Sequence, residues 1–275
     1  MSEEKVQAPE EETKAPPLNA KEEAADFFRT ASIAVLLALV VRALLFEPFN
    51  IPSGSMKPTL LIGDYLFVSK SAYGYSKHSF PFSFAPIEGR IFEKPAKRGD
   101  VIVFKLPSNP RIDYIKRVIG LPGDTIQVKS GHLYLNGEAV PRESVGLSKD
   151  TSDYGEDITM NEYIQTLPDG TMFTIFEESD TGPLDDTPLF KVPEGHVFVM
   201  GDNRDNSQDS RVPMMPGSHG VGFVPIENIV GRADFLFFSV NGQSRLFEIW
   251  KWPWGIRYSR LFMNIDPTRP KIEAE

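Results

Sequence analysis

Two serines separated by one glycine stand in the segment PSGSM, which runs from Pro52 to Met56. Serine hydrolysis needs a hydroxyl nucleophile, a base that takes its proton, and hydrogen-bond donors directed at the developing oxyanion. Gly54 lets backbone and substrate approach closely, so one of Ser53 and Ser55 is a candidate nucleophile and the other a candidate donor. The same residues also occur in ordinary turns, and the segment alone leaves both interpretations open.

A candidate base lies in the segment DYIKRVIGLPGD, from Asp113 to Asp124. The period of a β-strand directs Lys116 and Arg117 to opposite faces. Of the two, only the lysine can become neutral at accessible pH, because desolvation lowers the pKa of an ammonium group while a guanidinium stays charged. Lys116 is therefore the candidate base; the competing interpretation is a strand lysine whose amine reaches solvent.

A third segment, GDNRDNSQDSR from Gly201 to Arg211, is almost wholly polar and follows the apolar run HVFVM. It is either a solvated turn or a buried network in which the polar side chains satisfy one another's hydrogen bonds. A calcium-binding loop does not fit, because Arg204 would occupy a ligand position and no glycine follows Asn206. A network would place Ser207 among the groups that hold a lysine and a serine in register.

Composition excludes several other chemistries. The 275 residues include no cysteine, which rules out disulfides, thiolate catalysis and cysteine-based zinc sites. The four histidines lie in unrelated contexts, none in H-E-x-x-H, and no G-x-S-x-G motif is present. The formal net charge is −9 and no basic stripe occurs, so nucleic acid is not an expected partner. No metal or other cofactor is expected.

An apolar segment precedes the serines at Phe27 to Phe46, FFRTASIAVLLALVVRALLF. As a helix it would span about 30 Å, the thickness of a hydrocarbon core, and its arginines lie near its ends, where long side chains reach the interface. We expect a transmembrane helix at 27–46 that serves as an uncleaved signal anchor, rather than a buried core helix or a cleaved signal peptide. The basic residues do not determine its orientation.

The rest of the chain divides by composition. Residues 1–26 are rich in Glu, Lys, Ala and Pro and are expected to form a disordered acidic tail. Short apolar runs bounded by Gly, Pro and Asp, such as GDVIVFKLP and TIQVKSGHLYLNG, predict a mainly β fold over 47–262, an antiparallel, barrel-like sheet domain. This would be the catalytic domain.

Two later regions complete this division. The more polar residues 142–190 are expected to form an inserted accessory β lobe, with a hairpin turn at Asp169 and Gly170. The stretch 245–262 contains all three tryptophans, and we expect it to complete the core rather than to lie at a membrane interface. Residues 263–275 would then be a C-terminal tail.

Taken in order, four groups of residues resemble the bacterial type I signal peptidase family, membrane-anchored proteases that remove signal peptides from exported proteins. The resemblance covers about Phe46 to Arg260. It is carried by FEPFNIPSGSMKPTLLIGDYLFVSK, by KRGDVIVF, by DYIKRVIGLPGD, and by GDNRDNSQDSR followed by GFVPIENIVGRA. One group could arise by chance, whereas four in order make the resemblance specific.

The resemblance implies roles for individual residues. Ser55 would be the acyl nucleophile and Lys116 its general base. Ser53 would donate a hydrogen bond to the oxyanion together with the Ser55 amide, and Ser207 would orient the lysine amine. The other residues implied near the site are those that help line the substrate groove, Ile51, Met56, Leu60, Tyr114 and Ile115, and those that form structural ion pairs, Asp202, Asp209 and Arg211.

The implied activity is removal of signal peptides from exported preproteins after an Ala-x-Ala-like site. The implied location is the bacterial cytoplasmic membrane, crossed once, with the catalytic domain on the extracytoplasmic side, in contact with lipid and near the secretion translocon. Nine residues connect Phe46 to Ser55, so even an extended chain keeps the hydroxyl within roughly 30 Å of the membrane. That tether would hold the nucleophile where a cleavage site leaves the bilayer.

Two features depart from the family pattern. Some members have two spanning segments where this chain has one, and VPMMPGSHGV at 212–221 resembles an insertion beside the polar segment. Two other interpretations stay open at this point. One is a serine–lysine autoprotease of the repressor type, and the other is a membrane-tethered β domain that binds peptides without cleaving them.

Overall fold

A computed structural model of the chain describes residues 20–80, 83, 85–151, 156–215, 220–241, 250 and 252–269. The chain divides into two compact units, Met1–Val41 and Arg42–Glu275. Most of the predicted acidic tail, residues 1–19, lies outside the described residues, as do 216–219 of the expected insertion.

The first unit is the body of one helix, α1 (Ala20–Leu44), whose last turn belongs to the second unit. In the described part of the chain, this is the one helix long and apolar enough to cross a membrane, with a mean hydropathy of 1.9 over Glu23–Arg42. The helix starts seven residues before the predicted start at 27. The prediction of disorder was therefore wrong for residues 20–26, where the run AKEEAAD consists mostly of strong helix formers.

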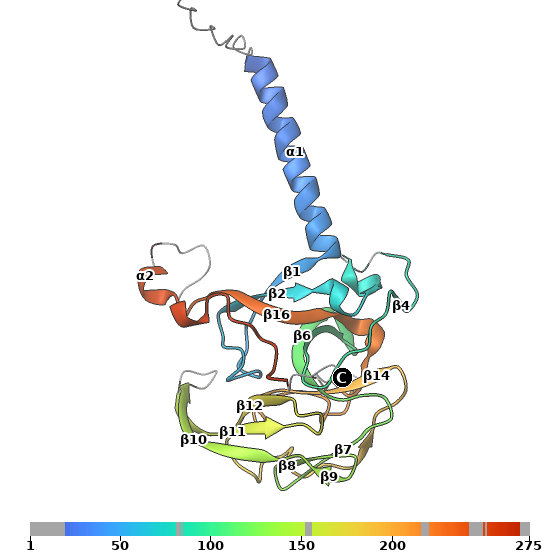
Figure 1. Cartoon of the computed structure of the whole chain (residues 1–275), viewed down its shortest axis with the longest axis vertical. Helices are drawn as coiled ribbons and strands as arrows, with labels where there is room; N and C mark the ends of the chain where they lie inside the picture. Colours follow the sequence, from blue (N-terminus) through green and yellow to red (C-terminus); the bar gives the residue numbers. More distant parts are fainter. Residues whose placement is uncertain are drawn as a thin grey trace, which may run out of the picture. The chain divides into compact units, whose positions relative to one another are not determined.

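The second unit consists mainly of short strands, and every pair of named strands is antiparallel (Figure 1). The strands are β1 (Phe46–Asn50), β2 (Asp64–Ser69), β3 (Tyr75–Ser76), β4 (Arg90–Ile91), β5 (Val101–Leu106), β6 (Asn109–Gly120), β7 (Thr125–Lys129), β8 (His132–Leu135), β9 (Glu138–Ala139), β10 (Arg142–Thr151), β11 (Asp157–Thr166), β12 (Met172–Glu177), β13 (Phe190–Lys191), β14 (His196–Met200), β15 (Val224–Pro225) and β16 (Ile229–Ser239). The predicted mainly β, antiparallel fold is confirmed.

The largest sheet has the strand order β1-β2-β16-β5-β6-β14-β15. Its central strand β5 reads VIVFKL and pairs with β16 and β6. Both faces of β5 are buried, because alternate residues of the strand pack into two different core clusters. A four-stranded sheet, β13-β7-β8-β9, and a two-stranded sheet, β3-β4, complete this part of the unit.

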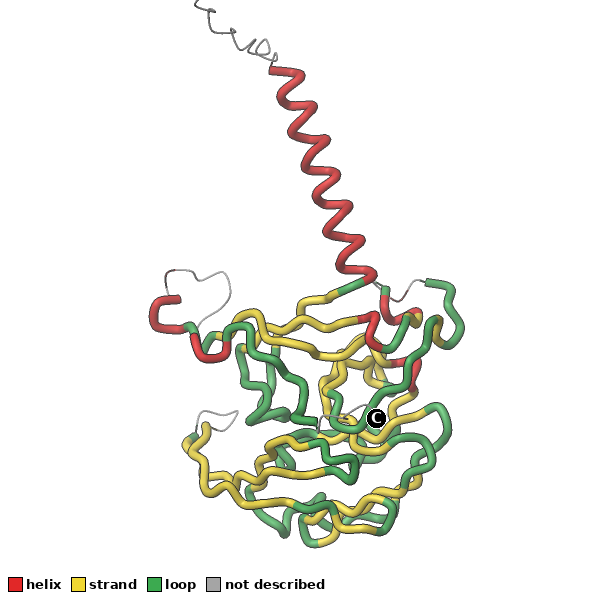
Figure 2. Tube along the Cα trace, in the orientation of Figure 1, coloured by secondary structure: helices red, strands yellow, loops and turns green. Residues whose placement is uncertain are grey.

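The accessory lobe is a three-stranded sheet, β10-β11-β12. β11 and β12 form the predicted hairpin, and Gly170 at its turn has a φ of 77°, which suits a residue without a Cβ. Within this unit, the lobe lies beside β7–β9, at the end opposite β1, β2 and β16 (Figures 1 and 2). β12 nevertheless reaches the polar segment after β14, because Phe176 and Asn203 form a β-bridge.

The C-terminal region differs from the prediction. Trp250 and Trp254 are 66% and 83% exposed, so the expectation that this stretch completes the core was wrong for these two side chains. Trp252, in the short helix α2 (Trp252–Gly255), does pack against a sheet residue, Phe238. Residues 263–269 also differ from the predicted tail, because Ile265 is buried in a core cluster with residues of β2, β5 and β16.

Candidate active site

The nucleophile candidate stands in the connection between β1 and β2. Apolar residues on both sides of it, Ile51, Met56 and Leu60, are buried in one core cluster with residues of β2, β5 and β16. Each such side chain contributes about 1.5–3 kcal/mol when fully buried, so the apolar residues fix the path of the loop. The intervening Ser53 is exposed and Ser55 is 8% exposed. The core thus positions the serines.

Lys116 lies in β6 opposite Ile102 of β5, and the residue is buried, with 4% of its surface exposed. Its Nζ is 2.7 Å from Ser55 Oγ, within hydrogen-bond distance, although the two residues are 61 positions apart. Nζ also donates a hydrogen bond to the carbonyl oxygen of Ile115 at 2.9 Å. That second bond fixes the direction of the amine, so a lone pair on the neutral form can face the serine hydroxyl.

Burial changes the protonation of this amine. Desolvation lowers the pKa of Lys116 from 10.5 to about 8, and the nearby carboxylates of Asp209 and Asp202 offset part of that effect. By the Henderson–Hasselbalch relation, roughly a tenth of the amine is then neutral at pH 7, far more than for an exposed lysine. A neutral amine within 2.7 Å of a hydroxyl can accept its proton.

The polar segment after β14 is a buried network, which was one of the two interpretations of its sequence. Asn203 bonds to the serine loop, the connection 51–63 between β1 and β2. Its backbone N–H donates a hydrogen bond to the Ser55 carbonyl oxygen at 3.1 Å, and its side-chain amide donates one to the Gly54 carbonyl oxygen at 3.2 Å. Gly201 lies so close that an added Cβ would come within 2.5 Å of the Ser55 carbonyl oxygen. The network and the serine loop are therefore in direct contact.

Two buried ion pairs stabilise this network. Asp202 accepts hydrogen bonds from Arg117 at 2.6 and 2.8 Å, and Asp209 accepts from Arg211 at 2.9 Å through each of its oxygens. Burial raises the pKa of Asp209, but the charge and hydrogen bonds of Arg211 outweigh it and the pKa is lowered overall. The acidic residues implied by the resemblance, Asp202 and Asp209, thus lie close to the site. For Arg117 the sequence predicted only that it points away from Lys116, and the structure shows that it pairs with Asp202.

A cavity of about 700 Å³ opens beside the Ser55–Lys116 pair. Its lining includes four residues implied by the resemblance besides that pair, namely Ser53, Tyr114, Ile115 and Ser207. The structure places Ile51, Met56 and Leu60 in the core and not among the residues lining this cavity, which corrects the expected set of groove residues. Ser207 is also corrected in one respect, because it makes no hydrogen bond to Lys116 Nζ.

One contact at the site had no signal in the sequence. Lys57, two residues after the nucleophile candidate, is buried, and its Nζ donates to both carboxylate oxygens of Asp150 at 2.9 and 3.0 Å and to the carbonyl oxygen of Thr151 at 2.6 Å. Asp150 and Thr151 end β10 of the accessory lobe, 93 and 94 positions away. The lobe is therefore attached to the serine loop.

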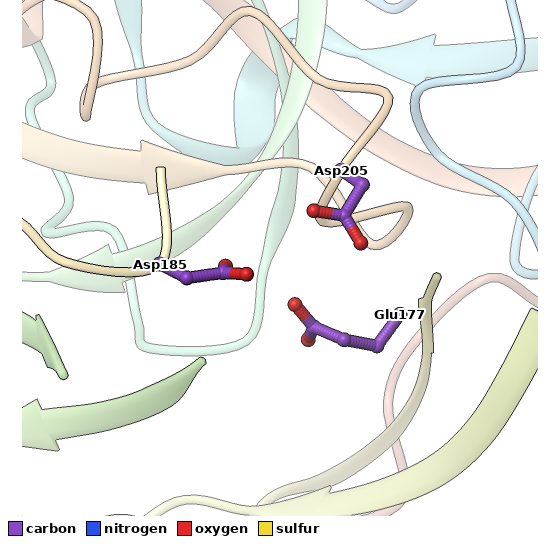
Figure 3. A group of neighbouring side chains, drawn as sticks. All are labelled: Glu177, Asp185 and Asp205. Atoms are coloured by element: carbon purple, nitrogen blue, oxygen red, sulfur yellow. The ribbon is translucent and has the colours of Figure 1, made fainter. Parts of the chain in front are cut away.

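Three carboxylates form a further group, the carboxylate cluster: Glu177, Asp185 and Asp205 (Figure 3). Their closest oxygens lie within 4.8 Å of one another, and Glu177 and Asp185 are buried. Desolvation, together with the neighbouring aspartates, raises the pKa of Glu177 to about 8 despite Arg204 and Arg142. An uncharged Glu177 relieves the repulsion within the cluster, and we assign no metal ion to it.

Comparison with known proteins decides the family. A family model described as "Signal peptidase, peptidase S26" matches residues 24–238. The chain belongs to this family. It is 39% identical over 256 residues to the signal peptidase I of Rickettsia typhi, covering 86% of this chain and 92% of that protein, and 38% identical over 256 residues to that of Rickettsia akari, covering 87% and 92%.

The chain is 30% identical in sequence to a signal peptidase I from Enterococcus faecalis whose structure has been solved. The match covers 50% of this chain and 97% of the Enterococcus faecalis chain, with a TM-score of 0.28. Family membership confirms the resemblance stated from the motifs and makes the chain a peptidase. Family membership thus favours a peptidase over the alternative of a non-catalytic binding domain. The family and helix α1 together fit a membrane-anchored protein.

Proposed function

We propose that this peptidase removes signal peptides from exported preproteins with Ser55 as nucleophile and the neutral amine of Lys116 as general base. The observation that carries the proposal is the 2.7 Å distance between Lys116 Nζ and Ser55 Oγ beside an open cavity. The pKa of about 8 supports it, because the base is then partly available at neutral pH. Neither side chain needs a metal or a histidine for this chemistry.

In the proposed reaction, the Ser55 hydroxyl proton moves to Lys116 Nζ as Oγ bonds to the carbonyl carbon of the scissile peptide. The lysine ammonium then gives this proton to the leaving amine nitrogen, the carbon–nitrogen bond breaks, and an ester remains on Ser55. Water, deprotonated by Lys116, attacks the ester and restores the serine. The Ser53 hydroxyl and the Ser55 amide would stabilise the oxyanion of both tetrahedral intermediates.

The open edge of β6 supports binding of an extended substrate. β14 pairs with β6 only at Arg117, Val118 and Gly120, whereas residues 112–116 of β6 line the cavity. A preprotein segment can add to this edge as a strand, with its backbone held by hydrogen bonds and alternate side chains directed toward the enzyme. Small pockets beside Tyr114 and Ile115 would account for cleavage after an Ala-x-Ala-like site.

For the location, we propose that α1 crosses the bacterial cytoplasmic membrane once and leaves Arg42–Glu275 on the extracytoplasmic side, near lipid and the translocon. Exposed Trp250 and Trp254 support contact with the bilayer surface, where tryptophan is enriched. Protease added to intact spheroplasts should digest the second unit without lysis. Digestion only after lysis would contradict this orientation.

The proposed function is tested with the purified full chain in detergent and a preprotein that carries an Ala-x-Ala site. Ser55→Ala should lower kcat by at least about 10³-fold because it removes the proposed nucleophile, the hydroxyl 2.7 Å from Lys116 Nζ. Ser144→Ala is the matched control, since Ser144 is an exposed serine of β10 outside the cavity. Cleavage by Ser55→Ala at the wild-type rate would overturn the proposal, and so would failure of the wild-type chain to cleave any preprotein.

A further inference from the structure

A short segment that follows β12, within the predicted lobe region 142–190, lines the cavity beside the Ser55–Lys116 pair. Pro183 and Leu184 line this cavity together with Ser53, Ser55 and Lys116. Pro183 is exposed and Leu184 is half-buried, so both present apolar surface to whatever occupies the cavity. The segment lies in the region between β12 and β13 to which neither the motifs nor the proposed chemistry gives a role.

Pro183 and Leu184 are the two central residues of a closed turn, Gly182 to Asp185. The Asp185 backbone N–H donates to the Gly182 carbonyl oxygen at 3.2 Å, and the Gly182 N–H donates to Asp185 Oδ2 at 2.6 Å. Asp185 is 1% exposed, so the side chain that closes the turn is itself fixed by burial. Proline suits the second position of such a turn because its φ is already set. The two apolar residues therefore have a defined position.

The 182–185 turn is also fixed to the polar network that holds the nucleophile. Asp205 Oδ2 accepts hydrogen bonds from the backbone N–H groups of Glu178 and Ser179, at 2.7 and 3.1 Å, just before the turn. An added Cβ on Gly182 would lie 2.6 Å from Asp205 Oδ1, so the turn and this side chain are in close contact. Figure 3 shows Asp205 and Asp185 directed toward the same space. The network thus sets the distance between the turn and Ser55.

The lining of the cavity also includes four consecutive polar residues, Asp205, Asn206, Ser207 and Gln208, of which Asp205 contacts the turn. Leu184 adds an apolar side chain to this lining. A substrate side chain packed against it gains from apolar burial, while a rigid turn limits how large that side chain can be. An apolar wall with a fixed position is suited to selecting a residue by size.

We propose that Pro183 and Leu184 are specificity-determining residues that contact one substrate side chain next to the cleaved bond. The proposal rests on the proposed function of the Ser55–Lys116 site. The accessory lobe then has a direct part in substrate selection, and the lobe residues Asp185 and Glu178, with Asp205 of the network, act by positioning the turn.

The test uses the purified full chain in detergent and a set of preproteins. Six substrate positions are varied, three before and three after the cleaved bond. Each preprotein carries Ala, Leu or Phe at one of these positions, and kcat/KM is measured for each. Leu184→Trp should lower the ratio of kcat/KM for Phe to that for Ala about tenfold at one position, because added bulk narrows the cavity. Leu184→Ala should raise the same ratio at the same position.

Leu189→Trp is the matched control, since Leu189 is an exposed leucine of the same lobe region outside the cavity. It should leave every ratio within about twofold of the wild-type value. If Leu184→Trp disturbs folding, as judged from its thermal unfolding midpoint, Leu184→Ala decides the question because it adds no bulk. Unchanged ratios at all six positions for Leu184→Ala would overturn the proposal. If the wild-type chain cleaves and Ser55→Ala does not, that result leaves the proposed function intact.

Discussion

The Ser55–Lys116 site and the carboxylate cluster show the same physical effect with different consequences. Burial favours the uncharged form of both Lys116 and Glu177, so that one pKa falls from 10.5 and the other rises from 4.5, each to about 8. At pH 7, Glu177 is therefore mostly neutral and Lys116 is a base within reach of physiological pH. Desolvation alone does not distinguish a reactive group from a structural one.

The surroundings make the distinction. Lys116 borders the 700 Å³ cavity and contacts a hydroxyl that can act as a nucleophile. Glu177 is 2% exposed, does not line that cavity, and has an arginine, Arg142, 3.5 Å from its carboxylate. A shifted pKa therefore indicates a catalytic group here only together with access and a reaction partner.

The largest expected effect separates the two groups by substitution. Lys116→Met should lower kcat by about 10²–10⁴-fold, the contribution of a general base. Glu177→Gln should lower it less than about threefold, because the amide keeps the shape of an uncharged acid. Both are measured as preprotein cleavage in detergent, with Lys129→Met of β7 as the control for loss of a lysine. Equal losses of kcat in Lys116→Met and Glu177→Gln would contradict the distinction between a catalytic Lys116 and a structural Glu177.

A second prediction concerns the buried Asp202–Arg117 pair of the polar network. Asp202→Asn should lower the free energy of unfolding by about 3–5 kcal/mol, because it leaves the buried Arg117 guanidinium without its counter-charge. Urea titration of the full chain in detergent measures this. The more accessible pair Arg232–Asp234, whose side chains are 32% and 23% exposed, provides the control, and Asp234→Asn should lower the free energy of unfolding by less than about 1 kcal/mol. Equal losses of unfolding free energy in the two variants would show that burial does not determine how much Asp202 contributes to stability.

The third prediction is a pH dependence of stability with opposite signs. Glu177 binds a proton more tightly in the folded state, so its stabilisation is present below pH 4.5 and is lost as the pH rises through 8. Lys116 binds its proton less tightly in the folded state, so its contribution increases as the pH rises from 8 to 10.5. Each slope is at most about 1.4 kcal/mol per pH unit.

Urea titrations at a series of pH values measure these slopes. Glu177→Gln should flatten the profile between pH 4.5 and 8, and Lys116→Met should flatten it above pH 8. Identical profiles for the wild type and both variants would show that neither group is shifted.

The smallest expected effect is at the contact between lobe and serine loop. Asp150→Asn removes the counter-charge of the buried Lys57 amine but keeps a hydrogen-bond acceptor. We expect a loss of about 1–3 kcal/mol of stability and a severalfold lower kcat, since Lys57 lies two residues from Ser55. Lys105 of β5 is half-buried and paired with Asp113 of the neighbouring strand β6, and Lys105→Met offers a comparison for the loss of stability. A stability loss with unchanged kcat would limit the role of the lobe at this contact to folding.

Several parts of this site could be predicted from sequence, because residue type limits the chemistry. With no cysteine and no histidine motif, serine and lysine were the candidate nucleophile and base, and the resemblance to the family implied Ser55 and Lys116 in these roles. The strand period predicted that Lys116 and Arg117 point to opposite faces of the strand, and in the structure they do have different partners, Ser55 and Asp202. The apolar residues around Ser55 were assigned less well: Met56 and Leu60 suit a groove as well as a core by type, and only packing distinguishes the two.

Other contacts had no local signal. Lys57 and Asp150 are 93 positions apart, and the residues around either one do not indicate the other as its partner. The 182–185 turn likewise depends on Asp205, which lies 20 positions or more beyond it, so its place in the cavity follows from the fold alone. Trp254 was misassigned because a tryptophan suits both a core and an exposed, interface-seeking surface.

The central claim is that a neutral Lys116 amine accepts the proton of Ser55. It is tested most directly by the pH dependence of kcat/KM for preprotein cleavage by the full chain in detergent. The account predicts a rise with pH to a plateau, with an apparent pKa of about 8 and a tenfold fall per pH unit below it. A value of kcat/KM that stays constant between pH 6 and pH 10 would contradict the account.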